Sequence, residues 1–246
     1  MSTYQRIVSL VPSLTELLIH LGLKERLVGR TRFCIHPADE IKDIPIFGGT
    51  KNPRLEEIKK AVPDIILANR EENRKEDIKS LEKDVKVMLT DITTIEDALI
   101  TIHEIGKRFG KEVESDQLAG QIAASLEQRP EEPPLRTAYL IWRDPWMTVG
   151  ADTYIRDVMD HWRLINVFDD QQRYPQITLQ QIGQRDPDLL LLSSEPYPFK
   201  KKHVDEVKEQ LPDTRILLVE GEWFSWYGSR MLPAFEKLNV WRKAIA

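Results

Sequence analysis

The segment LEEIKKAVPDIILANRE at residues 55–71 has a second copy, LQQIGQRDPDLLLLSSE, at residues 179–195. Both copies read as an amphipathic helix, a Pro-Asp turn, a buried apolar strand and a glutamate past the carboxyl end of that strand. The residues that recur at this offset of 124 are Leu55, Ile58, Pro63, Asp64, Leu67 and Glu71 in the first copy, and Leu179, Ile182, Pro187, Asp188, Leu191 and Glu195 in the second. Two similar lobes explain the repeat best, and a chance match of a common helix and strand pattern is the alternative.

Predicted strands and helices alternate around each copy. After the first predicted strand, Pro12 is followed by Ser13 and Glu16 at the spacing of a capping box, which predicts the start of a helix. Such alternation in short units is typical of α/β lobes with parallel sheets. The predicted strands are Ile7–Val11, Leu27–Arg30, Asp64–Ala68 and Val85–Leu89 in the first half, and Thr137–Trp142, Leu189–Ser193 and Arg215–Val219 in the second.

The segment between the two halves differs in kind. From Ile95 to about Gln128 there is no proline, and apolar residues recur at helical spacing, which predicts one long helix of roughly 50 Å. A break into two helices at Gly110 is the alternative. The sequence PEEPP at residues 130–134 ends the segment. We therefore expect an N-terminal α/β lobe over residues 1–92, a connecting backbone helix over 93–130 and a C-terminal α/β lobe over 131–246, with a ligand cleft between the lobes, because open α/β sheets bind ligands beyond the carboxyl ends of their strands.

Composition excludes several classes of protein. The chain has 246 residues, of which 41% are hydrophobic and 30% charged, with a net charge of -5. A single cysteine, Cys34, excludes a disulfide framework and a Cys-rich metal site within one chain. The weak acidity argues against a broad nucleic-acid surface, and no apolar stretch approaches the roughly 18 to 20 residues that span a bilayer. The segment Ile7–Leu23 carries Pro12, Glu16 and His20 and lacks a small-residue cleavage site, so it does not read as a signal peptide.

The sequence contains no recognisable catalytic motif. It has no nucleophile elbow, phosphate-binding glycine loop, dinucleotide fingerprint or His-Glu-x-x-His helix, and no two of its five histidines share metal-ligand spacing. Cys34 and His36, beside Pro37 in a predicted loop, form a pair that offers a thiolate and an imidazole to a soft metal. A buried cysteine and a histidine that does not ligate is the favoured alternative. We expect neither a metal site nor an intrinsic cofactor.

Aromatic residues are concentrated in loops that follow predicted strands of the second half. Trp142 and Trp146 flank Arg143, while Trp223 and Trp226 follow the strand that ends at Val219. Rings with polar edges suit a large, flat, partly polar ligand, and Arg143 or Arg230 would bind its carboxylate or phosphate through paired hydrogen bonds. The alternative is that these rings pack inside the second lobe.

Glu71 and Glu195 occupy equivalent positions in the two copies of the repeat. If both are exposed at the tips of the lobes, they would form a pair of acidic groups for a two-fold-related basic partner. The alternative for the charge run around Glu71, which includes Glu72 and Glu76, is an ordinary solvated helix start.

The chain as a whole resembles one family of binding proteins. The segments that carry the resemblance are IVSLVPSLTELLIHLG at 7–22, IFGGTKNPRLEEI at 46–58, VPDIIL at 62–67, DPWMTVGADTYIRDVM at 144–159, INV at 165–167 and Tyr174-Pro175. In this order and spacing they are similar to the helical-backbone, or class III, substrate-binding proteins that serve ABC importers of cobalamin, ferric siderophores and haem. The cobalamin-binding members offer the closest likeness.

The resemblance implies two Rossmann-like lobes joined by one long backbone helix, with the ligand held between them. It also implies cleft aromatics that pack against a corrin ring, and by position Phe33, Trp223 and His36 would take these roles. Leu89 stands where such proteins can carry an aromatic residue, which speaks against cobalamin itself. The complete set of expected ligand-binding residues is Phe33, His36, Trp142, Arg143, Trp146, Tyr174, Trp223, Trp226 and Arg230.

The function that follows is a monomeric substrate-binding protein, not an enzyme, that captures a metal chelate or corrinoid for an ABC importer. Glu71 and Glu195 would dock on the permease, and the resemblance places the protein in the periplasm or on the cell surface. The absence of a signal peptide leaves a cytoplasmic location open, so a cytosolic chelate-binding, storage or sensing protein is one alternative. An enzyme that modifies a corrinoid or chelate through Cys34 and His36 is the other.

Overall fold

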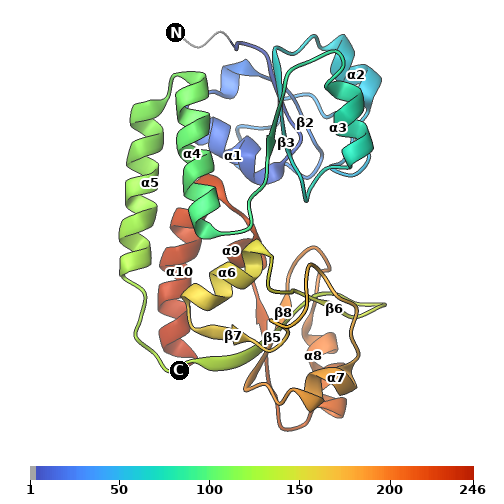
Figure 1. The fold of residues 1–246 in the computed structure, drawn as a ribbon, viewed down its shortest axis with the longest axis vertical. Helices are drawn as coiled ribbons and strands as arrows, with labels where there is room; N and C mark the ends of the chain where they lie inside the picture. Colours follow the sequence, from blue (N-terminus) through green and yellow to red (C-terminus); the bar gives the residue numbers. More distant parts are fainter. Residues whose placement is uncertain (1–3) are drawn as a thin grey trace. The chain divides into compact units, whose positions relative to one another are not determined.

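The computed structural model describes residues 4–246, which separate into two compact units (Figure 1). Unit 1 holds the residues up to Ile92 together with Glu96–Ala123 and Tyr227–Met231. Unit 2 holds Thr93–Ile95, Ala124–Trp226 and Leu232–Ala246. Each unit contains its own largely parallel sheet with helices on both faces, so the predicted α/β class is confirmed.

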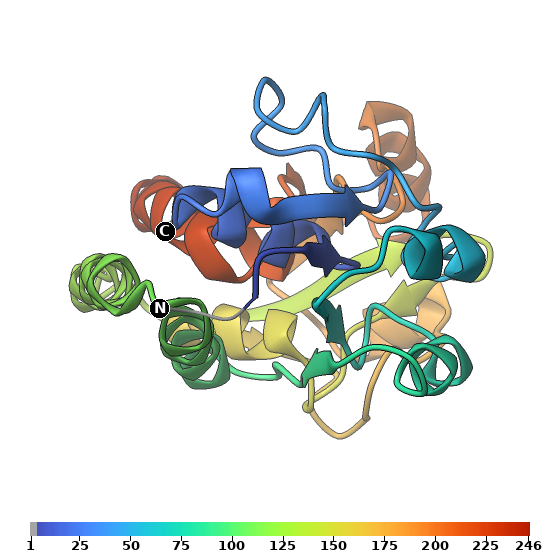
Figure 2. The ribbon, with the colours of Figure 1, turned by 90° about the horizontal axis from the view of Figure 1, so that it is seen from above.

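Unit 1 is built on a four-stranded parallel sheet in the order β2-β1-β3-β4. Helices α2 and α3 lie on one face of the sheet, and α1 and α4 lie on the other (Figures 1 and 2). The strands are β1 Ile7–Ser9, β2 Leu27–Arg30, β3 Ile65–Asn69 and β4 Val87–Thr90. The helices are α1 Pro12–His20, the 3-10 turn η1 Lys24–Arg26, α2 Leu55–Lys60 and α3 Lys75–Leu81.

Alternate residues of the strands build the core of unit 1. Val8 of β1 and Ile66 of β3 belong to one buried cluster with Ile58 of α2 and with Ile78 and Leu81 of α3. Successive side chains of a strand point to opposite faces. The neighbours Ile7, Ile65 and Leu67, which are fully buried, therefore serve the face covered by α1 and α4.

Unit 2 is built on a five-stranded sheet in the order β6-β5-β8-β9, with β7 also paired to β5. Only the two-residue β6 runs antiparallel to its neighbour. The strands are β5 Leu135–Trp142, β6 Met147–Thr148, β7 Leu164–Asn166, β8 Leu189–Ser193 and β9 Arg215–Val219. The helices of the C-terminal half are α6 Tyr154–His161, α7 Leu179–Gln184, α8 Lys201–Gln210, α9 Glu222–Ser225 and α10 Met231–Ala244, with the 3-10 turn η2 Gly228–Arg230.

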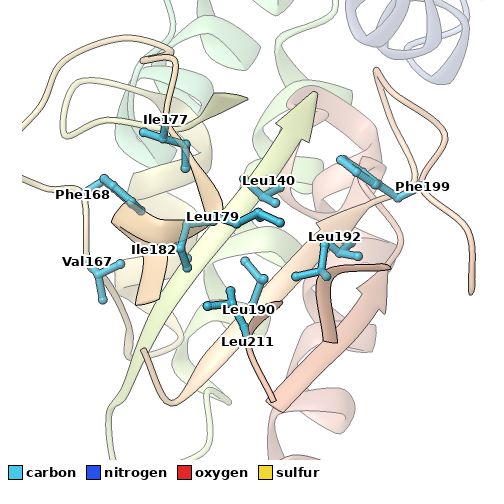
Figure 3. Packing of buried hydrophobic residues seen from close by; sticks show 12 residues of the cluster. Leu140, Val167, Phe168, Ile177, Leu179, Ile182, Leu190, Leu192, Phe199 and Leu211 are labelled. Atoms are coloured by element: carbon cyan, nitrogen blue, oxygen red, sulfur yellow. The ribbon is translucent and has the colours of Figure 1, made fainter. Parts of the chain in front are cut away.

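The core of unit 2 follows the same plan (Figure 3). Leu140, Leu190 and Leu192 pack with Leu179 and Ile182 of α7. On the other face of the sheet, Tyr139 meets Phe224 of α9 with ring centroids 5.2 Å apart. Each unit thus has its own sheet, buried on both faces as parallel sheets require.

The repeat is present in the structure at the offset seen in the sequence. Helices α2 and α7 begin and end 124 residues apart, and so do strands β3 and β8. In unit 1 the backbone N of Arg6 donates to Asp64 Oδ2 over 2.9 Å, and the guanidinium of Arg6 donates to the carbonyl oxygens of Val62 and Ala61. Val62 has a left-handed φ of 45°.

Unit 2 repeats this arrangement, with Arg136 in the role of Arg6. The backbone N of Arg136 donates to Asp188 Oδ2 over 2.8 Å, and its guanidinium donates to the carbonyl oxygens of Asp186 and Arg185. Asp186 has a φ of 47°. An arginine at the start of the first strand therefore closes the turn between helix and strand in both units, which favours two similar lobes over a chance match.

The predicted continuous helix over Ile95–Gln128 is wrong. The segment forms two helices, α4 Ile95–Phe109 and α5 Glu112–Glu127, which lie side by side in Figures 1 and 2. Gly110 has a φ of +69°, and the N of Lys111 donates to the carbonyl oxygen of Gly106 over 2.8 Å. This is the bond by which a glycine in the left-handed region ends a helix, so the break at Gly110 is the correct alternative.

The capping box predicted at Ser13 is also wrong. Helix α1 begins at Pro12, one residue earlier, and its N-cap Val11 makes no side-chain capping bond. Proline is favoured in the first turn because its missing N–H would be unpaired there anyway. The carboxylate of Glu16 is engaged elsewhere, as described below. Within residues 4–246, no helix is at once long and apolar enough to span a bilayer.

Candidate functional site

The loops at the carboxyl ends of the unit 1 strands are fixed by a buried polar network. Asn69, the last residue of β3, donates through Nδ2 to Thr90 Oγ1 over 3.1 Å. Asn73 donates through Nδ2 to the carbonyl oxygens of Leu10 and Thr50, at 3.2 and 3.1 Å. Buried polar groups that are all paired rigidify a site. The loops after β1, β2 and β3 are therefore held together.

An exposed aromatic ring and an arginine lie on the loop that follows β2. Phe33 is 47% exposed, and the Arg32 guanidinium lies over its ring at 4.9 Å from the centroid. The N of Arg32 donates to the carbonyl oxygen of Gly48 over 2.8 Å, which fixes the base of this loop. Over residues 4–246 the Arg32 guanidinium forms no ion pair with a carboxylate. His36, further along the same loop, is half-buried.

The sulfur of Cys34 is unsuited to binding a soft metal as a thiolate together with His36. Cys34 is fully buried, and its Sγ lies 3.1 Å from Thr15 Oγ1 and 3.3 Å from Thr31 Oγ1. Burial raises the pKa of the Cys34 thiol, and the two hydroxyl contacts lower it. The effect of burial is larger, so the pKa lies above its ordinary value. The group therefore stays a neutral thiol inside unit 1. No group of three or more His, Cys, Asp or Glu side chains within the described part of the chain is arranged to hold a metal.

A second exposed ring stands at the carboxyl end of β5 in unit 2. Trp142 is 40% exposed and meets Tyr197 edge to face, with ring centroids 5.7 Å apart. Trp146 stacks on Phe199 at 6.0 Å with nearly parallel planes. The predicted concentration of rings beyond this strand is therefore real, although Trp146 is half-buried against a core residue.

Arg143 lies among these rings but is already paired. Its Nη1 is 2.7 Å from Asp144 Oδ2, and its Nη2 is 2.6 Å from Glu206 Oε1. The hydrogen bond to Glu206 is the main reason that the pKa of Arg143 is raised. Its guanidinium also lies 5.6 Å from the centroid of the Trp146 ring. Tyr174 lies outside this group on the loop beside β6, where Arg173 approaches its ring at 5.8 Å.

Trp223 and Trp226 lie on and just after the short helix α9, but their side chains differ in exposure. Trp223 is half-buried, with the Lys237 ammonium 5.9 Å from its ring centroid. Trp226 is only 8% exposed, and its Nε1 donates to Glu195 Oε1 over 2.8 Å. Trp223 therefore presents more surface to a ligand than Trp226 does.

Arg230 is engaged with a carboxylate of its own unit. Its Nε and Nη2 lie 3.0 and 2.7 Å from the two carboxylate oxygens of Glu16, and both side chains are largely buried. Such a two-pronged contact is among the stronger ion pairs. The free guanidinium expected at this position is not what the structure shows.

The two glutamates of the repeat are less exposed than expected. Both Glu71 and Glu195 are half-buried. The backbone of Glu71 is held on both sides, since its N donates to Asn69 Oδ1 over 2.8 Å and its carbonyl oxygen accepts from Lys51 Nζ. Glu195 Oε1 accepts from Ser225 Oγ over 2.6 Å as well as from Trp226. Docking through these two residues stays a prediction, but the expectation that both stand fully exposed is wrong.

The environment of Glu195 makes stability depend on pH. Burial, with Glu222 and Glu220 nearby, raises the pKa of Glu195 above its ordinary value despite the bonds from Ser225 and Trp226. The folded state thus binds this proton more tightly than the unfolded state, so wild-type stability falls as pH rises from the ordinary glutamate pKa of about 4.3 through the raised value. Glu195→Gln cannot titrate, so its melting temperature relative to wild type should increase across this interval.

Thermal melts of both proteins at half-unit steps between about pH 4 and pH 8 measure this difference, since the interval starts at the ordinary glutamate pKa. Glu209→Gln, at an exposed site of α8, is the matched control and should show a difference from wild type that does not change with pH. A difference that shrinks with rising pH for Glu195→Gln would mean that the carboxylate is favoured as the anion.

Two features of this region were missed by sequence reasoning. Arg32 was not singled out, although its position next to Phe33 could have drawn attention to it. Tyr197 was not singled out either, although it supports Trp142. Its signal would have been its place two residues after Glu195, in the loop that follows β8.

Comparison with known proteins places these units in a family. The family model described as "Periplasmic binding protein" matches residues 7–215. A vitamin B12-binding protein of Vibrio campbellii is 23% identical over 243 residues, covering 96% of this chain and 80% of that protein. An uncharacterized ABC transporter substrate-binding lipoprotein, YvrC of Bacillus subtilis, is 27% identical over 251 residues, covering 95% and 78% of the two chains.

Solved structures agree with the fold. The periplasmic haem-binding protein RhuT of Roseiflexus sp. RS-1 has a TM-score of 0.83 and 21% sequence identity, covering 98% of each chain. The likeness in fold thus extends over nearly the whole chain, as the resemblance of the sequence motifs does. Because the family model spans most of the sequence, the chain belongs to the periplasmic binding protein family.

Proposed function

We propose that this protein is the substrate-binding component of an ABC importer and that it captures a metal-containing macrocycle or chelate without transforming it. The family is one of binding proteins and not of enzymes. YvrC is named as a component of an ABC transporter, and the other two relatives are named for binding vitamin B12 and haem. The neutral, buried thiol of Cys34 gives the alternative of a chelate-modifying enzyme no support.

One observation carries the proposal. Each unit presents an exposed aromatic ring beside an arginine, in a loop that follows the carboxyl end of a strand. In unit 1 the pair is Phe33 and Arg32, and in unit 2 it is Trp142, the last residue of β5, and Arg143 directly after it. Ligands of open α/β sheets bind at this edge, and rings with adjacent cations suit a flat ligand with an anionic rim. The cleft between lobes implied by the resemblance is part of this proposal.

Among these ligands, haem is our first candidate. Arg32 has no carboxylate partner within the described residues, so it is available for the carboxylates at the rim of a haem or of a ferric chelate. Leu89 is 45% exposed at a position where an aromatic residue would be expected for a corrin ring. Cobalamin is the second candidate, supported by the name of a relative and by the sequence motifs.

Titration of the purified protein tests the proposal. Haemin, cyanocobalamin, cobinamide and a ferric siderophore would each be added while tryptophan fluorescence is recorded, and haemin binding would also be followed by the shift of its Soret band. We expect haemin to bind well below 100 µM, which corresponds to about -5.5 kcal/mol. If no compound of the panel binds more tightly than that, the proposed ligand class is wrong.

Docking to the permease is the second half of the proposal. Glu71 and Glu195 each follow the corresponding strand of their own unit, β3 and β8, which supports this half of the proposal. Glu72 or Glu76 of the same segment can take the place of Glu71, and the side chain of Glu76 is 74% accessible. Replacing the pair by lysine should abolish association with the cognate permease, whereas unimpaired association would favour a binding protein that acts without an importer.

A further inference from the structure

The helix that carries Trp223 is too short to hold itself in place. Helix α9 comprises only Glu222–Ser225, and helices of this length are unstable without outside contacts because nucleation is costly. Besides ring contacts of Phe224 with Tyr139 and Trp241, the segment is bonded to the loop after β8. Gly221, just before α9, donates through its N to Ser194 Oγ over 2.9 Å. We call residues 221–226, which include α9, the α9 turn.

One carboxylate oxygen joins the far end of the α9 turn to the loop after β8. Glu195 Oε1 accepts from Ser225 Oγ over 2.6 Å and from Trp226 Nε1 over 2.8 Å. Both donors are neutral, so neither bond requires charge on the acceptor, and an amide oxygen could accept them equally well by geometry. The shared acceptor holds the last residue of α9 and the residue after it.

The α9 turn also lies in direct contact with the side chain of Glu195. A Cβ added at Gly221 would fall 2.5 Å from Glu195 Cγ and 2.5 Å from Ser193 Oγ, distances that no real Cβ tolerates. The absence of a side chain at Gly221 therefore lets the turn close onto Glu195.

The backbone of Glu195 is itself fixed by hydrogen bonds. Ser193 Oγ donates to the carbonyl oxygen of Glu195 over 2.5 Å, and Tyr139 OH donates to Ser193 Oγ over 3.1 Å. Tyr139 is fully buried, and its ring packs on Phe224 of α9. The support for the turn thus continues from the core of the unit 2 sheet to Glu195.

We propose that Glu195 is a positioning residue that locks the α9 turn, and with it Trp223, through its acceptor oxygen rather than through its charge. For the effect on ligand binding, this inference rests on the proposed function, because Trp223 is one of the predicted ligand contacts. The lock within unit 2 is independent of that function. The inference also distinguishes a structural role of Glu195 from a docking role. A structural role needs only the acceptor oxygen, whereas docking on a basic partner needs the negative charge.

The lock can be tested without any ligand. The protein has six tryptophans, and their indole N–H groups give separate signals in a ¹⁵N-¹H NMR spectrum, with that of Trp226 assigned by Trp226→Phe. In wild type, the Trp226 indole proton should exchange slowly with solvent. Glu195→Ala should speed its exchange at least tenfold and shift the Trp223 signal, whereas Glu195→Gln should restore both. Glu209→Ala, an exposed site on α8, should leave the spectrum of both tryptophans unchanged.

Haemin supplies the second readout. We expect Glu195→Ala to weaken haemin binding at least tenfold and Glu195→Gln to remain within about twofold of wild type, a difference of at most about 0.4 kcal/mol. If Glu195→Gln behaves like Glu195→Ala, the charge and not the acceptor matters, and the inference is overturned. Unchanged indole exchange in Glu195→Ala overturns it as well.

The two readouts distinguish failure of this inference from failure of the proposed function. If wild type binds no haemin, the proposed haem ligand is wrong, but the indole exchange still decides whether the lock exists. If circular dichroism shows that Glu195→Ala does not fold, Ser225→Ala removes one of the two donors and is the milder variant. In Ser225→Ala the Trp226 indole proton should exchange faster than in wild type, but by less than tenfold. An unchanged rate would overturn the inference.

Discussion

Gly106→Ala is expected to destabilise the protein by about 1–3 kcal/mol, even though alanine is the better helix former. Gly106 lies inside α4, where it faces α5. A Cβ at this position would fall 1.9 Å from Ser115 Oγ, 2.5 Å from Ser115 Cβ and 3.0 Å from the carbonyl oxygen of Lys111. The last of these atoms is backbone at the turn between the helices, so the clash cannot be relieved by rotating one side chain. The pair of helices would have to move apart.

Gly120→Ala is the matched control, because it makes the same substitution in the partner helix α5. A Cβ at Gly120 meets no atom within 4 Å, so only the helix preference changes, and stability should rise by about 0.5–1 kcal/mol. Urea unfolding followed by circular dichroism measures both variants. Equal stabilisation by the two substitutions would show that α4 and α5 are not in close contact at Gly106.

The sequence was most informative where structure is local. The repeat at residues 55–71 and 179–195 predicted a helix, a turn and a buried strand, and α2, β3, α7 and β8 occur there at the same offset. Apolar periodicity and a Pro-Asp turn act within a few residues, so they can be recognised in a single chain. The matching role of Arg6 and Arg136 was not visible, because it depends on contacts with carbonyl oxygens about 50 residues away.

The helix break shows a different limit. Apolar residues recur at helical spacing on both sides of Gly110, and an isolated glycine is tolerated within a helix at a cost of about 1 kcal/mol. The pattern alone therefore fitted one helix as well as two. What decides the outcome is the packing of Gly106 against Ser115 and the left-handed conformation of Gly110, and neither is encoded in periodicity.

Side-chain partners were the least predictable part of the site. The sequence placed Glu195 just after a strand, which the structure bears out, whereas Arg230 lies in the 3-10 turn η2 that follows α9. It did not reveal that Arg230 pairs with Glu16, 214 residues away, or that Glu195 accepts from Trp226, 31 residues away. Residue type can suggest a role for a charged group, but the availability of that group depends on what the fold brings next to it. Arg32 illustrates the opposite case, since its guanidinium pairs with no carboxylate among residues 4–246.

Phe33→Ala is expected to weaken haemin binding about 30-fold, or about 2 kcal/mol. The ring is 47% exposed in the free protein, so its removal should cost little stability while removing a large contact surface for the macrocycle. The Arg32 guanidinium, now resting over this ring at 4.9 Å from its centroid, would also lose its platform. Ile100→Ala is the control, because Ile100 is similarly exposed at 50% but lies on α4, away from the loop after β2.

The contribution of Arg32 can be separated from that of Phe33 by comparing haemin with a ligand that lacks its carboxylates. Arg32→Gln removes the cation and should weaken haemin binding about tenfold, or about 1.4 kcal/mol, if the guanidinium binds a carboxylate at the rim of the macrocycle. The dimethyl ester of haemin lacks both anionic carboxylates, so wild type and Arg32→Gln should bind it with equal affinity. Phe33→Ala should weaken binding of the ester as well as that of haemin, because stacking does not depend on the carboxylates. If Arg32→Gln weakens binding of the ester and of haemin by the same factor, Arg32 acts by supporting Phe33 and not by recognising an anion. In that case the argument for haem over cobalamin would lose its basis, and cyanocobalamin would become the first candidate.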